Sequence, residues 1–189
     1  MTIIKSVLGR KMKMISKFIA YILRHNPSAV GIELDEHGWA DVSALIDGVC
    51  KTGRFVDMQM LEEIVVSDKK RRFAFNDDHT KIRANQGHSI KVNVEMKVCA
   101  PPDTLYHGTA DKYIESIRAN GIIKQSRNYV HLSKDIETAL KVGSRHGKAV
   151  VLKIDARQMY CDGYVFLLSA NNVWQTEWVP FKYVTEEIV

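Results

Sequence analysis

The feature that most constrains how this chain folds is a break near its middle, at Ala100-Pro101-Pro102-Asp103. Consecutive prolines interrupt both helices and β-ladders, because proline lacks the backbone N–H that either structure needs. The segments before the break have mostly helical patterns, whereas those after it have the pattern of short strands and helices. A chain of 189 residues is long enough to build two small cores. We therefore expect two lobes, residues 1–99 and 100–189.

The first lobe opens with an amphipathic pattern. Apolar residues recur at helical spacing up to Leu23, and Pro27 ends the pattern. This predicts a helix from about residue 14 to residue 25, with residues 1–13 as an additional N-terminal segment. Arg24 and His25 then lie on the last helical turn.

Two further helices and a hairpin are predicted in the same lobe. Asp41 and Asp57 each stand before a new helical pattern, where an aspartate side chain can cap the first turn. Residues 71–75 have the pattern of an extended segment, residues 76–80 are typical of a turn, and residues 81–84 resume an extended pattern. Three short helices followed by a β-hairpin predict a winged-helix lobe.

The second lobe has a pattern typical of a small mixed α+β domain. Residues 89–98, which lead into it, alternate as an extended segment does. Helices are predicted over residues 113–121, with Gly121 as the stop, and over residues 136–147. Extended segments are predicted at residues 104–108, 129–133, 149–155, 164–168, 171–175 and 178–184. We expect them to form two short sheets, so that the whole chain is of the α+β class.

Composition and charge exclude several classes of protein. The chain has 46% hydrophobic and 26% charged residues, which is typical of a globular protein. No apolar run reaches the ~18 residues that a membrane span needs, and the basic N-terminus lacks the apolar core of a secretory signal. We expect a cytoplasmic monomer. The three cysteines, Cys50, Cys99 and Cys161, are far apart, which favours reduced thiols and predicts no metal site.

The positive charge is unevenly distributed. Residues 1–97 contain 16 Lys and Arg against 12 Asp and Glu, whereas residues 98–189 contain 11 against 10. An excess of positive charge in one lobe favours a polyanionic partner such as nucleic acid, although many basic proteins bind none.

Several polar clusters of the first lobe are candidates for phosphate binding. Arg24-His25 at a helix C-terminus either complements the helix dipole or carries chemistry. The basic run Lys69, Lys70, Arg71 and Arg72 is either a solvated surface or a contact for a phosphate backbone. The segment that gathers Arg83, Gln86, His88 and Ser89 around a glycine offers hydrogen-bond donors for a phosphate, or simply closes the hairpin as a polar turn.

The second lobe has candidates for a nucleotide site, although neither a GxGxxG nor a P-loop sequence is present. His107 stands at the end of a predicted strand, followed by Gly108 and Thr109, and His131 lies on the next extended segment with Leu132 and Ser133 after it. Two histidines at sheet edges either line one cleft or are unrelated structural residues. Arg145, taken alone, has the pattern of a surface residue.

In their order along the chain, these motifs resemble the RNA 2′-phosphotransferase family, called Tpt1 in eukaryotes and KptA in prokaryotes. The segments that carry the resemblance are SKFIAYILRHNP, GIELDEHGWADV, SDKKRRF, IRANQGHS, LYHGTA, VHLS, VGSRHG and NNVWQT. They span about Ile15 to Pro180, and residues 1–13 lie outside. LRH, IRAxQGHS and HGT in this order are jointly specific.

The resemblance implies a winged-helix RNA lobe joined to a lobe like those of ADP-ribosyltransferases, which bind NAD⁺ without a Rossmann fold. It also implies a reaction in two steps. The RNA 2′-phosphate attacks C1″ of the nicotinamide ribose and expels nicotinamide. The ribose 2″-hydroxyl then attacks phosphorus, which releases RNA, with a tRNA splicing intermediate as the expected substrate, and ADP-ribose 1″,2″-cyclic phosphate.

The resemblance further implies roles for individual residues. Arg24, His25, Arg72 and Arg145 match the family's second-step residues, with Arg72 preferred to Arg71 because it keeps the Arg-Phe adjacency. Lys70, Arg71, Arg83, Gln86, His88 and Ser89 are then expected to bind RNA, and His107, Gly108, Thr109, His131, Leu132, Ser133 and Val173 to bind NAD⁺. Val173 stands where many protein-modifying relatives have a glutamate, and a phosphate acceptor that is already anionic needs no such base.

Two other functions remain open at this point. One is a winged-helix nucleic-acid-binding regulator whose second lobe has no activity. The other is transfer of ADP-ribose onto a terminal phosphate of a nucleic acid, which would leave a stable adduct.

Overall fold

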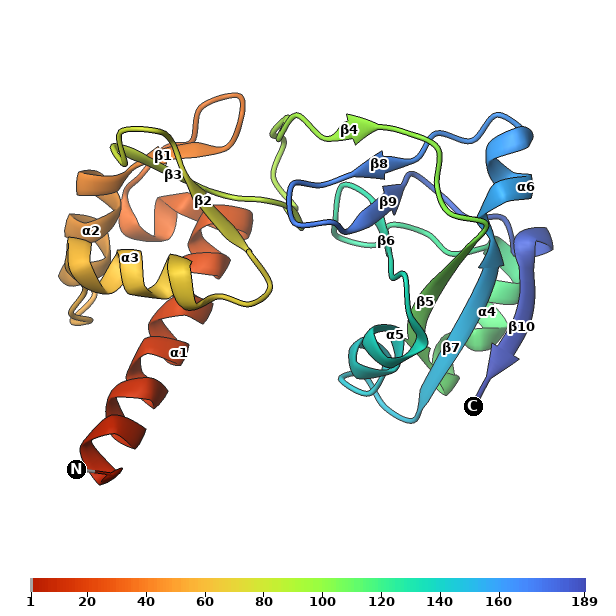
Figure 1. Ribbon diagram of the computed structural model, residues 1–189, viewed down its shortest axis with the longest axis horizontal. Helices are drawn as coiled ribbons and strands as arrows, with labels where there is room; N and C mark the ends of the chain where they lie inside the picture. Colours follow the sequence, from red (N-terminus) through yellow and green to blue (C-terminus); the bar gives the residue numbers. More distant parts are fainter. Residues whose placement is uncertain (1) are drawn as a thin grey trace. The chain divides into compact units, whose positions relative to one another are not determined.

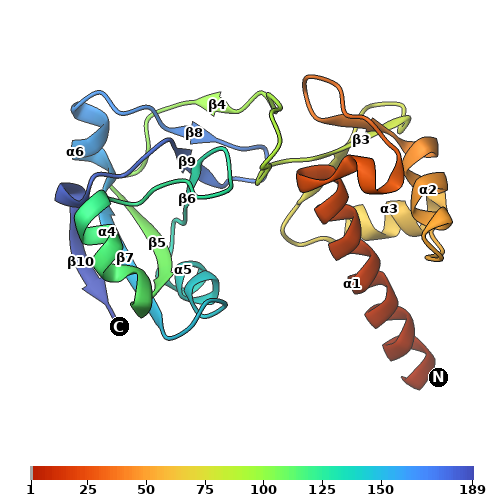
Figure 2. The same ribbon diagram turned by 180° about the vertical axis from the view of Figure 1, so that it is seen from behind.

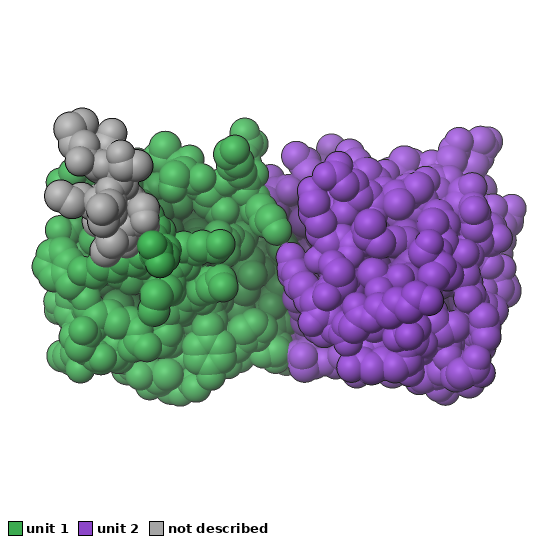
Figure 3. Space-filling view, turned by 90° about the horizontal axis from the view of Figure 1, so that it is seen from below, with its two compact units in different colours: residues 1–95 green, residues 96–189 purple. Residues whose placement is uncertain are grey.

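The computed structural model describes the backbone of residues 2–189 and the side chains of residues 9–189. The chain divides into two compact units, residues 1–95 and 96–189, which Figure 3 shows in different colours. Both units combine helices with small antiparallel sheets, so the predicted α+β class is confirmed.

The first unit contains three α-helices whose starts follow from its sequence. They are α1 (Thr2–His25), α2 (Val42–Lys51) and α3 (Met58–Ser67), with a 3-10 turn η1 (Pro27–Val30) after α1. The Asp41 carboxylate accepts a hydrogen bond from the Ala44 N–H, and the Asp57 carboxylate accepts one from the Met60 N–H, both at 2.8 Å. Each such cap stabilises its helix by about 1 kcal/mol. The two predicted caps are therefore confirmed.

Helix α1 is longer than predicted. It ends at His25, before Pro27, as expected, but it begins at Thr2 rather than near residue 14. The predicted start was wrong because the lack of apolar periodicity before residue 14 does not stop a helix. That stretch contains no proline, and lysine, leucine and methionine are good helix formers.

A three-stranded sheet completes the first unit. Its strands are β1 (Trp39–Asp41), β2 (Phe73–Phe75) and β3 (Lys81–Ala84), in the order β1-β3-β2. The predicted hairpin is confirmed as β2 paired antiparallel with β3, whereas β1 was not predicted.

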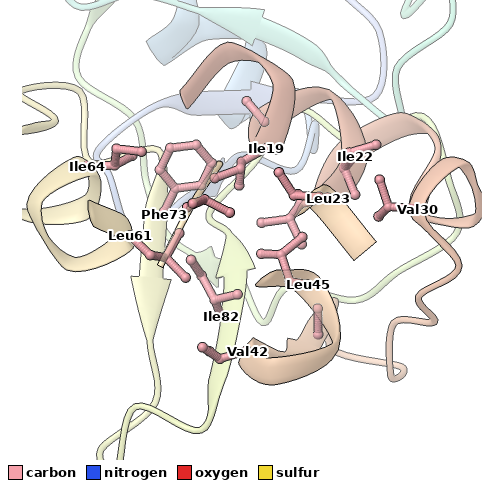
Figure 4. Close-up of a cluster of buried hydrophobic side chains, with 14 of the residues drawn as sticks. Ile19, Ile22, Leu23, Val30, Val42, Leu45, Leu61, Ile64, Phe73 and Ile82 are labelled. Atoms are coloured by element: carbon pink, nitrogen blue, oxygen red, sulfur yellow. The ribbon is translucent and has the colours of Figure 1, made fainter. Parts of the chain in front are cut away.

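The core of the first unit lies between these helices and the sheet. Figure 4 shows side chains from all three helices and from β2 and β3 pointing into it. Ile19, Ile22 and Leu23 of α1 are fully buried there, and each stabilises the fold by roughly 1.5–3 kcal/mol. This packing fixes the end of α1, where Arg24 and His25 lie.

The extended segment predicted at residues 89–98 is wrong over most of its length. Only Lys97–Val98 forms a strand, β4. Val92 and Val94 are half-buried, whereas Lys91, Asn93 and Glu95 are exposed, yet residues 89–96 form no strand. The alternation of side chains in the sequence therefore reflects partial burial of every second residue, not pairing in a sheet.

The second unit contains two small sheets, as predicted. One has the order β10-β7-β5 and the other the order β4-β8-β9-β6. Their strands are β5 (Thr104–Ala110), β6 (Val130–Leu132), β7 (Ala149–Asp155), β8 (Leu167–Leu168), β9 (Trp174–Thr176) and β10 (Val184–Ile188). A bridge between Tyr106 and Ser133 links β5 with the end of β6, so the two sheets meet there.

Short helices cover the first of these sheets. They are α4 (Ile114–Asn120), α5 (Ile136–Gly143) and α6 (Ala156–Cys161), with 3-10 turns η2 (Asp111–Tyr113) and η3 (Phe181–Tyr183). Figure 1 shows α5 beside β5, and Figure 2 shows α4 from the opposite side. The stop at Gly121 is confirmed, with φ of 73°.

Two predicted elements of the second unit need correction, and one helix was not predicted. The helix expected over residues 136–147 ends at Gly143. The strand expected over residues 178–184 is instead a loop and the turn η3, because Pro180 cannot donate to a ladder, and β10 starts only at Val184. Helix α6 was not predicted.

No helix in the described part of the chain combines the length and the apolar character needed to cross a membrane.

Candidate functional site

The end of α1 presents Arg24 and His25 to the loop that follows β3. The Ser89 N–H donates to the Arg24 carbonyl at 3.0 Å, and the Ser89 hydroxyl is hydrogen-bonded to Nδ1 of His25 at 2.9 Å. Gly87, with φ of 89°, passes over the Arg24 guanidinium, so that a Cβ there would lie 3.7 Å from the Arg24 Cζ. The loop after β3, distant in the sequence, therefore lies against both side chains. The structure brings together four of the predicted residues, Arg24, His25, His88 and Ser89.

His88 is the most perturbed titratable group of this cluster. Its side chain is only 3% exposed, and Nε2 has no hydrogen-bond partner among the described residues. Burial lowers the pKa of His88 to about 4, helped by the positive charges of Arg24, His25 and Arg83. His88 is therefore neutral at pH 7 and leaves an acceptor or a donor, depending on its tautomer, beside two arginines.

The lowered pKa of His88 predicts a pH dependence of stability. Between pH 6.5 and 4 the unfolded chain protonates this side chain and the folded chain does not. The contribution of neutral His88 to the free energy of unfolding is therefore complete above pH 6.5 and is lost as the pH falls towards 4. At 1.36 kcal/mol per pKa unit, the loss is about 3 kcal/mol. Hydrogen exchange of the β3 amides should show this loss in the parent protein and a smaller one in His88→Gln. Equal losses in both proteins would contradict the assignment.

Arg72, in the same unit, is held by an ion pair with Asp68. Its guanidinium binds both carboxylate oxygens of Asp68, at 2.9 and 3.1 Å, and donates to the Ser16 hydroxyl of α1 at 3.3 Å. Burial alone would raise the pKa of Asp68, but hydrogen bonds from the Arg72 side chain and N–H outweigh it, so that this pKa is lowered. The lowered pKa of Asp68 keeps the pair charged at neutral pH, and the Arg72 side chain stays 28% exposed.

Arg71, unlike Arg72, is held in place only through its backbone. It is exposed and adopts φ of 44°, which is uncommon for a residue with a side chain. Its carbonyl accepts a hydrogen bond from Nδ2 of Asn85 at 2.6 Å, and the Arg72 carbonyl accepts one from the Asn85 N–H at 2.8 Å. The loop is thus clamped by Asn85, a buried residue that sequence reasoning missed.

The other predicted RNA-binding residues are placed as follows. The Arg83 guanidinium pairs with Glu95 at 3.2 Å and stacks over the Trp39 ring at 4.4 Å, so that it is largely engaged within the protein. Lys70 is exposed on the loop that Asp68 organises. Gln86 is half-buried.

In the second unit, the side chain of one predicted histidine contacts the main-chain carbonyl of the other. Nδ1 of His107 on β5 lies 3.0 Å from the His131 carbonyl on β6. A carbonyl only accepts, so Nδ1 of His107 carries the proton and its Nε2 is an acceptor. Burial lowers the pKa of His107, the hydrogen bond to His131 opposes this, and the charge of Arg127 adds to the lowering. His107 is therefore neutral at pH 7.

His131 has the opposite tautomer. Nη1 of Arg127 lies 3.2 Å from Nδ1 of His131. A guanidinium only donates, so Nδ1 of His131 accepts and its proton is on Nε2. The two imidazoles together therefore offer one acceptor and one donor, a pair suited to vicinal hydroxyl groups such as those of a ribose.

Arg127 and Arg145 place two positive charges near these histidines. Arg127 lies in the loop before β6, and Arg145 lies just after α5, where its N–H donates to the Val142 carbonyl. Although much of Arg127 is exposed, its pKa is lowered because part of its surroundings is protein rather than water and because Arg145 is near. Two arginines at one place favour an anion such as a diphosphate. Arg127 was missed, since nothing in its local sequence marks it.

Strand β9 adds two buried polar groups beside β6. Gln175 pairs with His131 across the strands, and Trp174 pairs with Leu132. Nε2 of Gln175 and Nε1 of Trp174 are buried and have no hydrogen-bond partner within the described residues. Unsatisfied buried donors are costly, and a bound ligand would relieve them. Val173, just before β9, is half-buried.

The remaining predicted nucleotide residues serve the fold in visible ways. A Cβ at Gly108 would lie 1.7 Å from the Ala139 carbonyl, so this glycine lets α5 pack on β5, and the packing accounts for it without a ligand. Thr109 and Leu132 are buried. Ser133 exchanges two backbone hydrogen bonds of 2.8 Å with Tyr106.

Comparison with known proteins gives a consistent result. The sequence model described as "RNA 2'-phosphotransferase, Tpt1 / KptA family" matches residues 10–178. A protein of Flavobacterium johnsoniae is 51% identical over 172 residues, which cover 91% of this chain and 94% of that protein. One of Fusobacterium nucleatum is 51% identical over 171 residues, covering 90% and 96%, and one of Acaryochloris marina is 46% identical over 179 residues, covering 95% and 99%. All three are named "Probable RNA 2'-phosphotransferase".

Proposed function

Because this chain belongs to the Tpt1/KptA family of RNA 2′-phosphotransferases, we propose that it transfers the 2′-phosphate of an RNA to NAD⁺. The observation that carries the proposal is the family match over residues 10–178, which includes every residue given a role below. The first unit, residues 1–95, is a winged-helix RNA-binding lobe. The second unit, residues 96–189, is an ADP-ribosyltransferase-like lobe.

The second lobe holds NAD⁺ through the groups gathered around His131. Nε2 of His107 accepts from a ribose hydroxyl and Nε2 of His131 donates to one, which their opposite tautomers support. Arg127 neutralises the diphosphate, with the charge of Arg145 nearby. The buried donors of Trp174 and Gln175 are satisfied by the dinucleotide. When bound, NAD⁺ supplies an electrophilic ribose carbon with nicotinamide as leaving group.

The first step needs little from the protein beyond orientation. The RNA 2′-phosphate is already an anion, so no general base is required to make it a nucleophile. That is consistent with Val173 at a position where a base would otherwise stand. Attack forms an oxygen–C1″ bond, breaks the bond to nicotinamide and leaves ADP-ribose on the RNA phosphate.

The second step needs positive charge and a proton carrier. Attack by the ribose 2″-hydroxyl on phosphorus builds negative charge on the phosphate oxygens, and Arg24, Arg72 and Arg145 stabilise that charge. The RNA 2′-oxygen leaves as a hydroxyl and must gain the proton that the attacking hydroxyl loses. His25 transfers it, since an imidazole titrates near neutral pH and Ser89 fixes its Nδ1.

An assay of a 2′-phosphorylated oligonucleotide with and without NAD⁺ tests the proposal. We expect the phosphate to be lost only with NAD⁺ present, together with release of one nicotinamide per phosphate. A nucleic-acid-binding regulator would release no nicotinamide. An enzyme that modifies terminal phosphates would instead leave ADP-ribose stably attached to RNA, and either result would contradict the proposal.

A further inference from the structure

One face of α1 carries basic and aromatic residues along its described length. At 100° per residue, Arg10, Lys13, Met14, Lys17 and Tyr21 lie within about 100° of one another around the helix axis. We call these five residues the α1 stripe. All of them are exposed, Met14 by 72% and Tyr21 by 47%. The same face continues to Arg24 and His25, so the stripe leads directly to the cluster at the end of α1.

No acidic residue within α1 offsets the positive charge of the stripe. The sequence contains no Asp or Glu before Glu33, so α1 is purely cationic. Lys13 and Lys17 form no ion pair with any residue whose side chain is described. Helix stability does not require both Lys13 and Lys17, since like charges four residues apart destabilise a helix. The arrangement favours an external polyanion.

The aromatic residue of the stripe adds a surface for bases. The Tyr21 ring lies 6.0 Å from the His25 ring, and its hydroxyl accepts a hydrogen bond from Nδ2 of Asn26 at 3.3 Å. Its ring is therefore held in place while it remains 47% exposed. Cations that track a backbone, with an aromatic ring between them, are typical of surfaces that bind single-stranded nucleic acid.

The opposite face of α1 argues against a membrane as the partner over the part of the helix whose side chains are described. A helix that binds a lipid surface must present an apolar face to it. Ile15, Ile19, Ile22 and Leu23 are at most 3% exposed, because they form the core of the first unit (Figure 4). That face is therefore not available to a lipid surface, and the described stripe combines its charges with the single exposed side chains of Met14 and Tyr21.

We propose that the α1 stripe binds the backbone of RNA nucleotides that flank the 2′-phosphate. From Arg10 to Arg24 the helix rises about 21 Å at 1.5 Å per residue. Stacked nucleotides advance about 3.4 Å each along one strand, so the stripe spans roughly six of them. The placement of the 2′-phosphate near Arg24 rests on the proposed function. Binding of RNA along α1 does not.

Binding of two labelled RNAs, measured by fluorescence anisotropy, tests this inference. One is a 2′-phosphorylated trimer, and the other is a single-stranded 12-mer with the same phosphate and flanking nucleotides. In Lys13→Gln/Lys17→Gln we expect the 12-mer to bind roughly tenfold more weakly at 0.1 M salt. The slope of log affinity against log salt should fall by about 1.4, because each lost contact to a single strand removes about 0.7. Affinity for the trimer should change less than about twofold.

The matched control removes the same charge elsewhere. Lys51, at the end of α2, and Lys97, on β4, are exposed and lie outside the stripe. Lys51→Gln/Lys97→Gln should leave the salt slope for the 12-mer unchanged. The inference is overturned if this control weakens the 12-mer as much as the stripe variant does, or if the stripe variant weakens trimer and 12-mer equally. Binding of the parent protein to anionic vesicles that the stripe variant loses, with RNA binding intact, would also overturn it.

The same experiment separates this inference from the proposed function. Anisotropy detects RNA without NAD⁺ and without turnover. If the 12-mer requires the stripe but the phosphate is never removed, the proposed function fails and the stripe stands. If the phosphate is removed normally from the 12-mer by the stripe variant with unchanged KM, the stripe fails and the proposed function stands.

Discussion

Replacement of Arg145 by alanine is expected to make RNA that carries ADP-ribose on its 2′-phosphate accumulate. Arg145 is exposed and close enough to Arg127 to lower that residue's pKa. In the proposed reaction it stabilises the charge that develops at phosphorus in the second step. Loss of one group that stabilises developing negative charge typically slows a step by about 10²- to 10³-fold. The first step creates no such charge at phosphorus, so it should be slowed much less. Gel analysis of a labelled oligonucleotide over time would reveal the adduct.

Arg157→Ala is the control for this experiment. Arg157 is also an exposed arginine of the second unit, with a side chain that is 72% exposed and 3.7 Å from Asp103. Its loss should change neither step by more than about twofold. An Arg145→Ala enzyme that turned over as Arg157→Ala does, without an adduct, would show that Arg145 has no part in the second step.

Arg72 and Arg71 are expected to differ sharply when each is replaced by alanine. The bidentate contact with Asp68 fixes the Arg72 guanidinium, whereas Arg71 is exposed and held only through its backbone. Arg72→Ala should slow the second step by about 10²- to 10³-fold, and Arg71→Ala by less than about threefold. Arg72→Lys should also be slow, because an ammonium group cannot replace both contacts. Single-turnover rates of adduct decay measure each effect.

Removal of Arg72 also leaves the buried Asp68 carboxylate without its partner, which lowers stability. Rates should therefore be compared at a temperature where melting curves show every variant folded. Asp68→Asn is a useful comparison, since it loosens Arg72 without removing it. If Arg71→Ala were the slow enzyme and Arg72→Ala the normal one, the assignment of the two residues would be reversed.

The elements of the fold that depend on residues nearby in the sequence could be predicted from the sequence. The caps at Asp41 and Asp57, the stop at Gly121 and the hairpin of β2 and β3 all follow from local rules. The errors arise where a longer-range partner decides the structure. Strand β1 exists only because β3 pairs with it, and residues 89–96 alternate without pairing with any strand.

The candidate site divides in the same way. Residue types that are chemically distinctive within a motif, such as Arg24, His25 and His107, could be singled out from the sequence. Arg127, Asn85 and Gln175 could not, because their roles come from contacts with residues distant in the chain or across a sheet. Asn85 acts on a loop 14 residues away, and Gln175 meets His131 only through the pairing of β6 with β9.

The tautomers of the two histidines likewise required the structure. Both are histidines near strand ends in the sequence, yet one contacts a carbonyl and the other a guanidinium. This difference makes one imidazole an acceptor and the other a donor at Nε2. No sequence pattern distinguishes them.

The fate of the transferred phosphorus tests the central proposal most directly. An oligonucleotide with radiolabelled phosphorus in its 2′-phosphate is incubated with the protein and NAD⁺, and the products are separated. The label should leave the RNA and appear in ADP-ribose 1″,2″-cyclic phosphate, in an amount equal to the nicotinamide released. Label that appears as inorganic phosphate, or that leaves the RNA equally well without NAD⁺, would contradict the proposal.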